Sequence, residues 1–182
     1  MRLEGKVSLI TGGARGIGAA IATLFAQEGS SVFIGDVLEA QGAKRAEGLR
    51  KLGRIATFRT LDVTKEEDWQ TAVKAIINEF GRLDILVNNA AVATGSIFEM
   101  TSIKNLKQVF EINFFAQMNI IQKLLRFMKK SKNASIINVG SAAGLLNQRG
   151  TLAYGSSKAA LMFSTKVMAN ELALYKIRVN SI

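Results

Sequence analysis

Short segments rich in apolar residues recur along the chain, separated by longer segments in which apolar residues return at helical spacing. The short segments have four to six residues, a length that suits strands better than helices. The first of them, Val7 to Thr11, is typical of a buried strand. The pattern predicts strands over residues 7–11, 31–36, 56–61, 85–88, 135–139 and 178–182.

The longer segments predict helices over residues 17–28, 41–52, 66–80, 105–130 and 151–175. Strands and helices therefore alternate, which favours a parallel sheet with helices on both faces. At 182 residues and 48% hydrophobic content, the chain is long enough to bury a full core. We predict an α/β fold, a doubly wound parallel sheet in a Rossmann-like three-layer arrangement, as a single domain over residues 1–182.

A glycine-rich turn, Gly12-Gly13-Ala14-Arg15-Gly16-Ile17-Gly18, connects the first predicted strand to the first predicted helix. Glycines at this place let the backbone turn tightly, so that a pyrophosphate can approach the unpaired amides and positive dipole of the helix start. The spacing is Gly-x-x-x-Gly-x-Gly rather than the commoner Gly-x-Gly-x-x-Gly. A glycine cluster alone is equally compatible with a simple tight turn.

Asp36 ends the second predicted strand, 18 residues after Gly18. A carboxylate at that place can accept hydrogen bonds from the adenosine ribose hydroxyls and would repel a 2′-phosphate. This favours NAD as the cofactor. An ordinary turn aspartate is the alternative, and Arg15, whose guanidinium could meet a 2′-phosphate, leaves NADP open.

Tyr154 and Lys158 stand four residues apart in a predicted helix. At this spacing two side chains share one helix face, so an ammonium can lie beside a phenol and favour its ionised form. Such a pair is a candidate proton-transfer device. The same spacing also arises by chance on surface helices, so the pair gains its meaning from the motifs around it.

Taken together, these motifs resemble the short-chain dehydrogenase/reductase family, and the matching residues extend from one end of the chain to the other. Beyond the glycine turn, Asp62-Val63 is similar to the family's adenine-side acid, and Asn88-Asn89-Ala90 to a segment that stabilises the central sheet. Asn113 is similar to the family's asparagine in the long middle helix. Ser141 is similar to the catalytic serine, thirteen residues before Tyr154.

The resemblance implies hydride transfer between a nicotinamide cofactor and a carbonyl or secondary-alcohol substrate. It makes Tyr154 the acid or base, and Ser141 the group that holds the reacting oxygen. It assigns Lys158 to the nicotinamide ribose and to favouring the phenolate, and Asn113 to a water-borne proton path. The cofactor site that it implies consists of Gly12, Arg15, Gly16, Ile17, Gly18, Asp36, Asp62, Val63, Asn89, Ala90, Tyr154 and Lys158.

The chain departs from the family pattern in three places. Ala91 stands where the family usually has glycine, and Gly140 where it often has a second serine. Family members also continue past the equivalent of Ile182 into a Pro-Gly cofactor loop, a substrate lid and one more strand. We therefore expect the natural polypeptide to be longer than this sequence.

Composition excludes several kinds of chemistry. Cys and His are both 0, which excludes disulfides, thiol nucleophiles and the usual zinc ligands, so no metal site is expected. The apolar run after the N-terminal charges is too short for a secretory signal, and no run approaches about 18 apolar residues. The sequence therefore predicts a cytoplasmic protein with no membrane segment.

The formal net charge is +10, and residues 112–170 contain no acidic residue but eight basic ones. One interpretation is a surface that binds nucleic acid or an acidic protein. The other is a solvated helix end, because Lys129, Lys130 and Lys132 would complement a C-terminal helix dipole. We favour the second and expect no nucleic-acid binding, since aromatic residues do not interleave with the charges.

The predicted helices 105–130 and 151–175 have more apolar residues than one buried face needs. This excess suggests that part of the apolar surface meets another subunit, and the family resemblance implies a homo-oligomer, a dimer or tetramer, formed through these helices. Burial within one subunit is the alternative.

Our prediction is an oxidoreductase acting on a carbonyl and secondary-alcohol pair. One alternative is a 3-oxoacyl-carrier-protein reductase, in which Lys129, Lys130 and Lys132 would receive the acidic carrier protein. A less favoured one is a non-catalytic regulator that senses the cofactor.

Overall fold

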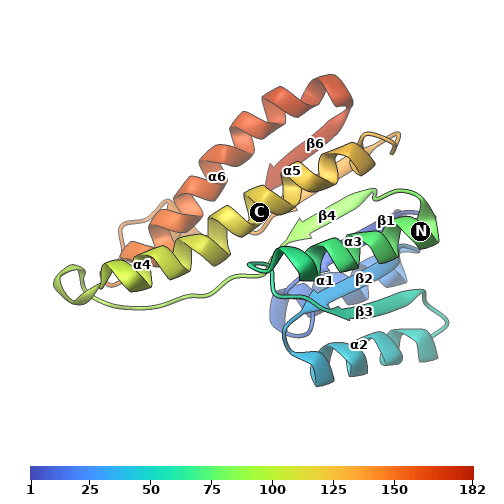
Figure 1. Ribbon diagram of the computed structural model, residues 1–182, viewed down its shortest axis with the longest axis horizontal. Coiled ribbons are helices and arrows are strands. Elements are labelled where there is room, and N and C mark those ends of the chain that lie inside the picture. Colours follow the sequence, from blue (N-terminus) through green and yellow to red (C-terminus); the bar gives the residue numbers. More distant parts are fainter.

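The computed structural model describes residues 1–182 and contains a single six-stranded sheet in the order β3-β2-β1-β4-β5-β6 (Figure 1). Every neighbouring pair of strands is parallel. The strands are β1 (Val7–Thr11), β2 (Ser31–Asp36), β3 (Ala56–Thr60), β4 (Ile85–Asn88), β5 (Ala134–Asn138) and β6 (Ile177–Ser181).

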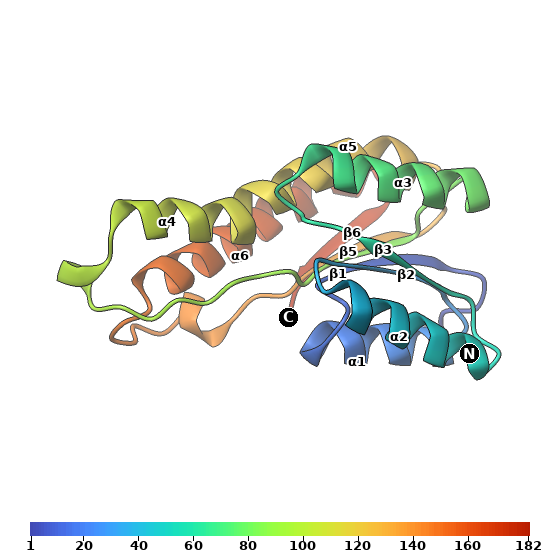
Figure 2. The ribbon, with the colours of Figure 1, turned by 60° about the horizontal axis from the view of Figure 1, so that its bottom comes forward.

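Helices cover both faces of this sheet (Figure 2). On one face lie α1 (Gly16–Gln27) and α2 (Glu39–Lys51). On the other lie α3 (Glu66–Phe80), α5 (Ala116–Met128) and α6 (Leu152–Leu172), and α4 (Ile103–Phe110) extends beyond the sheet. The predicted doubly wound α/β fold is confirmed.

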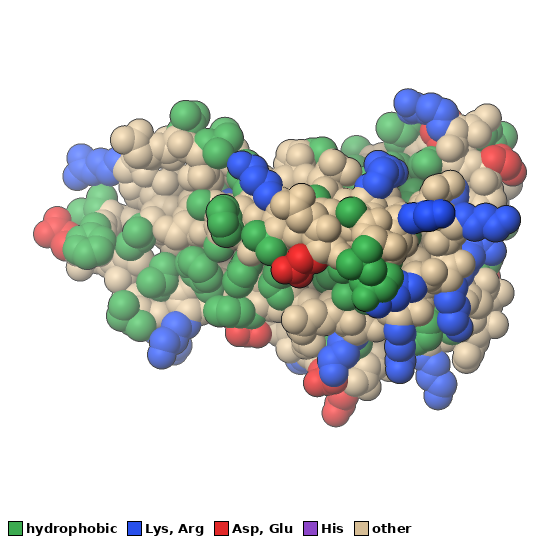
Figure 3. All heavy atoms as spheres, turned by 90° about the horizontal axis from the view of Figure 1, so that it is seen from above, with side chains coloured by type: hydrophobic (Ala, Val, Ile, Leu, Met, Phe, Trp, Pro, Cys, Tyr) green, Lys and Arg blue, Asp and Glu red, His purple; other side chains and the backbone are tan.

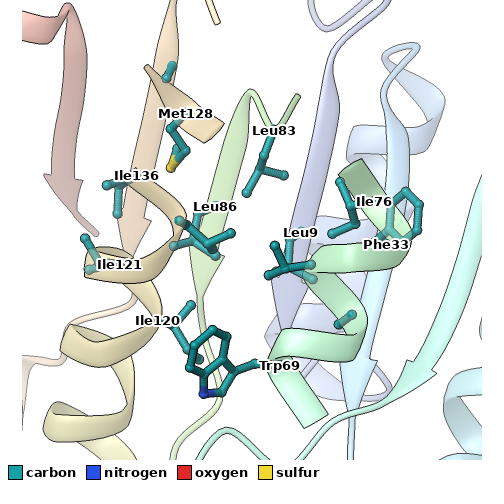
Figure 4. Close-up of a cluster of buried hydrophobic side chains, with 14 of the residues drawn as sticks. Leu9, Phe33, Trp69, Ile76, Leu83, Leu86, Ile120, Ile121, Met128 and Ile136 are labelled. Carbon is teal, nitrogen blue, oxygen red and sulfur yellow. The ribbon is translucent and has the colours of Figure 1, made fainter. Parts of the chain in front are cut away.

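The two faces of the sheet have separate hydrophobic cores because successive strand side chains point to opposite faces. Leu9, paired in register with Phe33 and Leu86, faces α3 and α5. Figure 4 shows Phe33 beside Ile76 of α3, and Trp69 of α3 beside Ile120 of α5. Ile10 and its neighbours form the second core against α1 and α2. Burial on both faces explains why the strand segments are apolar throughout.

Several element boundaries differ from those expected from the sequence, by one or two residues. The strand expected to end at residue 61 ends at Thr60, and those expected at 135–139 and 178–182 begin one residue earlier, because Ala134 pairs with Ile177. Likewise α1 begins at Gly16 and α2 at Glu39 rather than at residues 17 and 41. Helix ends fray, and the apolar pattern does not determine them.

The prediction of one regular helix over residues 105–130 is wrong, because a π-turn interrupts this segment. The hydroxyl of Ser102 accepts a hydrogen bond from the Asn105 amide, so α4 begins earlier, at Ile103. A π-turn, η2 (Glu111–Phe115), then separates α4 from α5. The helix expected over 151–175 is α6 followed by a 3-10 turn, η4 (Ala173–Tyr175), which ends at Lys176 in a left-handed conformation.

The chain leaves β1 for β2 and β3 and then returns to β4 on the other side of β1. This reversal makes a crevice at the carboxyl ends of β1 and β4, where ligands bind in open parallel sheets. No helix has both the length and the apolar character that crossing a membrane requires.

Candidate active site

A cavity of about 480 Å³ opens at the carboxyl ends of β1, β2 and β4. Its walls come from the glycine turn, from the segments after β2 and β3, and from the segment after β4. Of the residues expected to bind a cofactor, it is lined by Gly12, Arg15, Gly16, Ile17, Asp36, Asp62, Val63, Asn89 and Ala90. Gly18 is buried behind them, and Tyr154 and Lys158 lie outside this cavity.

Two glycines allow the turn at the start of α1 to pack against the segment after β4. Gly12 has φ +64°, and a Cβ there would lie 2.9 Å from the Ala90 Cα. A Cβ at Gly18 would collide with the Gly12 carbonyl oxygen. The side-chain amide of Asn89 fixes the turn by donating to the carbonyl oxygens of Thr11, at 3.0 Å, and Gly12, at 2.9 Å.

The start of α1 suits an anion. No side chain caps the helix, and its first turn contains no acidic residue. The first backbone amides of a helix have no partner within it, and they stand at the positive end of its dipole. A dinucleotide pyrophosphate therefore fits this position in charge and in space.

Asp36 is buried at the end of β2. Its carboxylate oxygens accept hydrogen bonds from the Ala14 amide, at 2.9 Å, and the Leu38 amide, at 3.0 Å. These contacts fix the carboxylate at the cavity wall, and each oxygen has a further lone pair for a ribose hydroxyl. Arg15 is exposed at the same cavity, so both residues that bear on the choice of cofactor lie at one site.

Asp62 and Val63 follow β3 and line the same cavity. The Asp62 carboxylate accepts from the amide of Thr64, at 3.0 Å, and from its hydroxyl, at 2.7 Å. The Asp62 amide donates to Asp68 at 2.9 Å. The carboxylate therefore stabilises its own turn, which holds Val63 in place.

Thr11 is absent from the expected cofactor residues, although it holds two of them in place. Its hydroxyl oxygen accepts from the amides of Asn89 and Ala90, both at 3.1 Å. The strand that precedes the glycine turn is thus tied to the segment after β4. The sequence signal for this role is that Thr11 directly precedes Gly12, as the first residue of the segment that resembles the family's cofactor loop.

Tyr154 and Lys158 lie in the first turns of α6, as their spacing predicted. The Lys158 ammonium is 5.9 Å from the centre of the Tyr154 ring and donates a 2.7 Å hydrogen bond to the Val139 carbonyl oxygen. Only 1% of Lys158 is exposed. This burial lowers the pKa of Lys158 from 10.5 to about 8, so its charged form still predominates at neutral pH.

Ser141 follows β5 and caps a short turn, η3 (Ala142–Gly144), by accepting a 3.1 Å hydrogen bond from the Ala143 amide. This turn packs tightly on α6. A Cβ at Gly155 would lie 2.6 Å from the Ala143 carbonyl oxygen, and one at Gly144 would lie 2.8 Å from the Ala159 amide nitrogen. The two glycines thus bring the Ser141 turn against the helix that carries Tyr154.

Asn113 is fully buried in the π-turn η2. Its side chain accepts from the Val92 amide at 2.9 Å and donates to the Val92 carbonyl at 2.9 Å and to the Ser157 hydroxyl at 3.0 Å. Ser157 in turn donates to the Tyr154 carbonyl at 2.7 Å. Asn113 therefore contacts the neighbour of Lys158 rather than Lys158 itself. Ser157 was missed from the sequence, although it lies between Tyr154 and Lys158.

A basic patch, formed by Arg126, Lys129, Lys130 and Lys132, lies where α5 ends. Lys129 is 3.3 Å above the ring of Tyr175, and Arg126 is 4.5 Å from that of Phe127. The expectation that no aromatic residues interleave with these charges is therefore wrong, because the fold brings Tyr175 from η4 to the end of α5. Figure 3 shows Lys and Arg side chains gathered at one end of the molecule.

Comparison with known proteins gave matches over almost the whole chain. A family model described as short chain dehydrogenase matches residues 6–182. A 3-oxoacyl-(acyl-carrier-protein) reductase of Thermotoga maritima is 38% identical, over 100% of this chain and 74% of its own length. A cyclopentanol dehydrogenase of Comamonas testosteroni is 40% identical over 100% of this chain and 72% of its own length. A trans-4-hydroxycyclohexanecarboxylate dehydrogenase of Sinomonas cyclohexanicum is 38% identical over 100% of this chain and 72% of its own length.

Proposed function

The chain belongs to the short-chain dehydrogenase family, and from this premise we propose that it interconverts a secondary alcohol and a carbonyl compound, with Tyr154 as the acid or base. The observation that carries the proposal is that the buried Lys158 ammonium lies 5.9 Å from the centre of the Tyr154 ring, in a helix against which the Ser141 turn packs. A phenol beside a fixed cation, with a hydroxyl to hold the substrate oxygen, would suffice to move a proton to or from that oxygen.

The cavity at the glycine turn would hold a nicotinamide dinucleotide, which when bound accepts or supplies the hydride. The amides at the start of α1, at Gly16, Ile17 and Gly18, would bind its pyrophosphate. Asp36 would accept hydrogen bonds from its adenosine ribose, which favours NAD over NADP. Arg15, Asp62, Val63, Asn89 and Ala90 would line the rest of the site, and Lys158 would bind the nicotinamide ribose.

The chain's own residues would handle the proton. Tyr154 would donate to the carbonyl oxygen of a ketone, or take the proton from an alcohol in the reverse direction. Ser141 would hold the same oxygen by a hydrogen bond. Lys158, whose charged form predominates at neutral pH, would supply a fixed positive charge beside the Tyr154 ring. Asn113 would hold Ser157 and Val92 in place beside a water-borne proton path.

A secondary alcohol or ketone is the substrate class that we propose. Support comes from two relatives named for their action on cyclic alcohols, cyclopentanol and trans-4-hydroxycyclohexanecarboxylate. The direct test is the initial rate of oxidation of these two alcohols by the purified protein, with NAD⁺ and NADP⁺ compared at equal concentration. Cofactor-dependent turnover of either alcohol supports the proposal. Absence of turnover of any secondary alcohol or ketone in a broad panel contradicts it.

A second candidate substrate is a 3-oxoacyl group on an acidic carrier protein. It is favoured by the Thermotoga maritima relative and by the basic patch at the end of α5. Docking through exposed charges weakens steeply as salt rises through about 0.1 M, because the screening length there is about 10 Å. Reduction that is efficient, salt-sensitive and lost in the Lys129→Glu, Lys130→Glu double variant would select this candidate. Salt-insensitive oxidation of a free alcohol would select the first.

We also propose a homo-oligomer, a dimer or tetramer, that forms through residues 105–130 and 151–175. Large apolar side chains are exposed on these helices, with 53% of Phe115, 69% of Phe163 and 40% of Val167 accessible. Figure 3 shows hydrophobic side chains grouped on one face of the molecule. An apolar face of this kind on paired helices is typical of a subunit interface.

A further inference from the structure

Gln117 lies in the first turn of α5, outside every motif that the sequence analysis singled out, and only 1% of it is exposed. Its side-chain amide donates a 3.1 Å hydrogen bond to the carbonyl oxygen of Ala90. Ala90 belongs to the wall of the cofactor cavity. A polar side chain that is buried this deeply in an apolar core requires a reason, because its desolvation is unfavourable.

The glycine turn packs directly against the backbone of Ala90. Its amide donates to the Thr11 hydroxyl at 3.1 Å, and a Cβ at Gly12 would lie 2.9 Å from its Cα. A shift of the Ala90 backbone by a few tenths of an ångström would therefore move Gly12 or open a gap behind it. Thr11 holds the amide side of Ala90, and Gln117 holds its carbonyl side.

The oxygen of the same amide, Oε1, is buried and has no hydrogen-bond partner. The indole Nε1 of Trp69 is the buried side-chain N–H that also has none, and only 3% of Trp69 is exposed. Figure 4 shows the Trp69 ring beside Ile120, one turn along α5 from Gln117, with its nitrogen on the edge nearer the carboxyl ends of the strands. The unpaired indole N–H of Trp69 on α3 thus lies beside Ile120, three residues after Gln117 on α5.

We propose that Gln117 is a positioning residue for the cofactor site: it fixes the Ala90 carbonyl, and one water between Gln117 Oε1 and the Trp69 indole orients the Gln117 amide. The inference rests on the proposed function, because it assigns the cavity at Ala90 to a nicotinamide dinucleotide. It adds a connection from α5, a helix of the proposed subunit interface, to the cofactor turn.

The experiment compares wild type with Gln117→Met, a nearly isosteric change that removes both polar groups of the side-chain amide. Gln122→Met is the matched control, since Gln122 is an exposed glutamine on the same helix. Calorimetry with NAD⁺ and NADP⁺ measures cofactor affinity without any substrate. For Gln117→Met we expect the dissociation constant of the preferred cofactor to rise about tenfold, which corresponds to about 1.4 kcal/mol, while Gln122→Met binds like wild type.

A spectroscopic measurement separates positioning from a purely structural role. Trp69 is the single tryptophan, so the protein's tryptophan emission reports on this residue alone. We expect Gln117→Met to shift the emission to shorter wavelength, because the proposed water at the indole N–H loses the Gln117 oxygen that holds it. Saturating the wild type with cofactor should alter the emission, and saturating Gln117→Met should not.

The outcomes distinguish this inference from the proposed function. If wild type binds neither cofactor, the proposed function fails and the inference fails with it. If wild type binds and Gln117→Met binds equally well, or only melts at a lower temperature with unchanged affinity and emission, the inference alone is overturned. Trp69→Phe is the second variant, which keeps an aromatic ring in the core and removes only the indole N–H and its fused ring. It should weaken cofactor binding in the same direction, and unchanged affinity would remove Trp69 from the proposal.

Discussion

The side-chain amide of Asn113 donates a 3.0 Å hydrogen bond to the hydroxyl of Ser157. This contact joins the π-turn between α4 and α5 to the helix that carries Tyr154 and Lys158. π-Turns within helices are frequent at functional sites, because the extra residue redirects a side chain. Here the redirected side chain is that of Asn113, which also holds both polar groups of the Val92 backbone.

The first prediction is that Asn113→Ala destabilises the protein and slows turnover. The substitution leaves the half-buried Val92 amide and carbonyl without their partner and removes the donor to the Ser157 hydroxyl, and each buried polar group that loses its hydrogen bond costs about 1–3 kcal/mol. We expect the free energy of unfolding in urea to fall by about 3 kcal/mol. Asn119→Ala, at a half-buried asparagine on α5, is the control and should change it by less than about 1 kcal/mol. A similarly small decrease in the free energy of unfolding of both variants would show that the hydrogen bonds of Asn113 to Val92 and Ser157 do not stabilise this part of the fold.

The second prediction concerns the pH dependence of stability. Burial lowers the pKa of Lys158 to about 8, so below about pH 8 the folded protein carries an unfavourably buried charge. Between about pH 8 and 10.5 the unfolded chain binds the extra proton, and the free energy of unfolding therefore rises with pH.

Lys158→Met removes this titration. Because a shift of one pKa unit corresponds to about 1.4 kcal/mol, its free energy of unfolding relative to wild type should fall by about 2.5 kcal/mol between about pH 7 and pH 10. Urea unfolding of both proteins at the two pH values measures this difference. A difference that does not change with pH would mean that Lys158 titrates at its ordinary pKa.

The third prediction concerns the choice of cofactor. Wild type should have a higher kcat/KM with NAD⁺ than with NADP⁺, because the Asp36 carboxylate repels a 2′-phosphate. Asp36→Asn keeps an oxygen for a backbone amide but removes the charge, so the ratio of the two kcat/KM values should fall at least about tenfold. Steady-state kinetics with both cofactors provide the ratio. Preference of the wild type for NADP⁺ would contradict the role of Asp36, and Arg15→Ala would then test whether Arg15 selects the phosphate.

The fourth prediction concerns assembly. Phe163→Glu places a charge on the exposed apolar face of α6 and should shift the protein from oligomer to monomer in light scattering. Leu52→Glu is the control, since Leu52 is equally exposed, at 68% against 69% for Phe163, but lies at the end of α2 on the other side of the sheet. A wild type that is already monomeric at micromolar concentration would contradict the interface.

The sequence predicted the sheet, its helices and most of the residues around the cofactor cavity. These features depend on local patterns: buried strands are apolar, and Gly12, Gly16 and Gly18 stand where a strand meets a helix. It also predicted that Tyr154 and Lys158 share a helix face, because the helical repeat determines this.

The sequence could not predict features that depend on packing between distant segments. The π-turn at Glu111–Phe115 has the same apolar periodicity as a regular helix, so the expected helix was continuous. Tyr175 meets Lys129 only because η4 and the end of α5 come together in the fold. Thr11, Ser157 and Gln117 act through hydrogen bonds to the backbone of other segments, and their residue types alone give no sign of this.

The central claim is that Tyr154 is the acid or base, and Tyr154→Phe tests it most directly. The chain has two tyrosines, so Tyr175→Phe is a matched control that removes the same hydroxyl at the basic patch. With a secondary alcohol that wild type oxidises, kcat for Tyr154→Phe should fall by about 10²- to 10⁴-fold, while cofactor affinity and Tyr175→Phe turnover stay close to wild type. Turnover of Tyr154→Phe within a few fold of wild type would contradict the account.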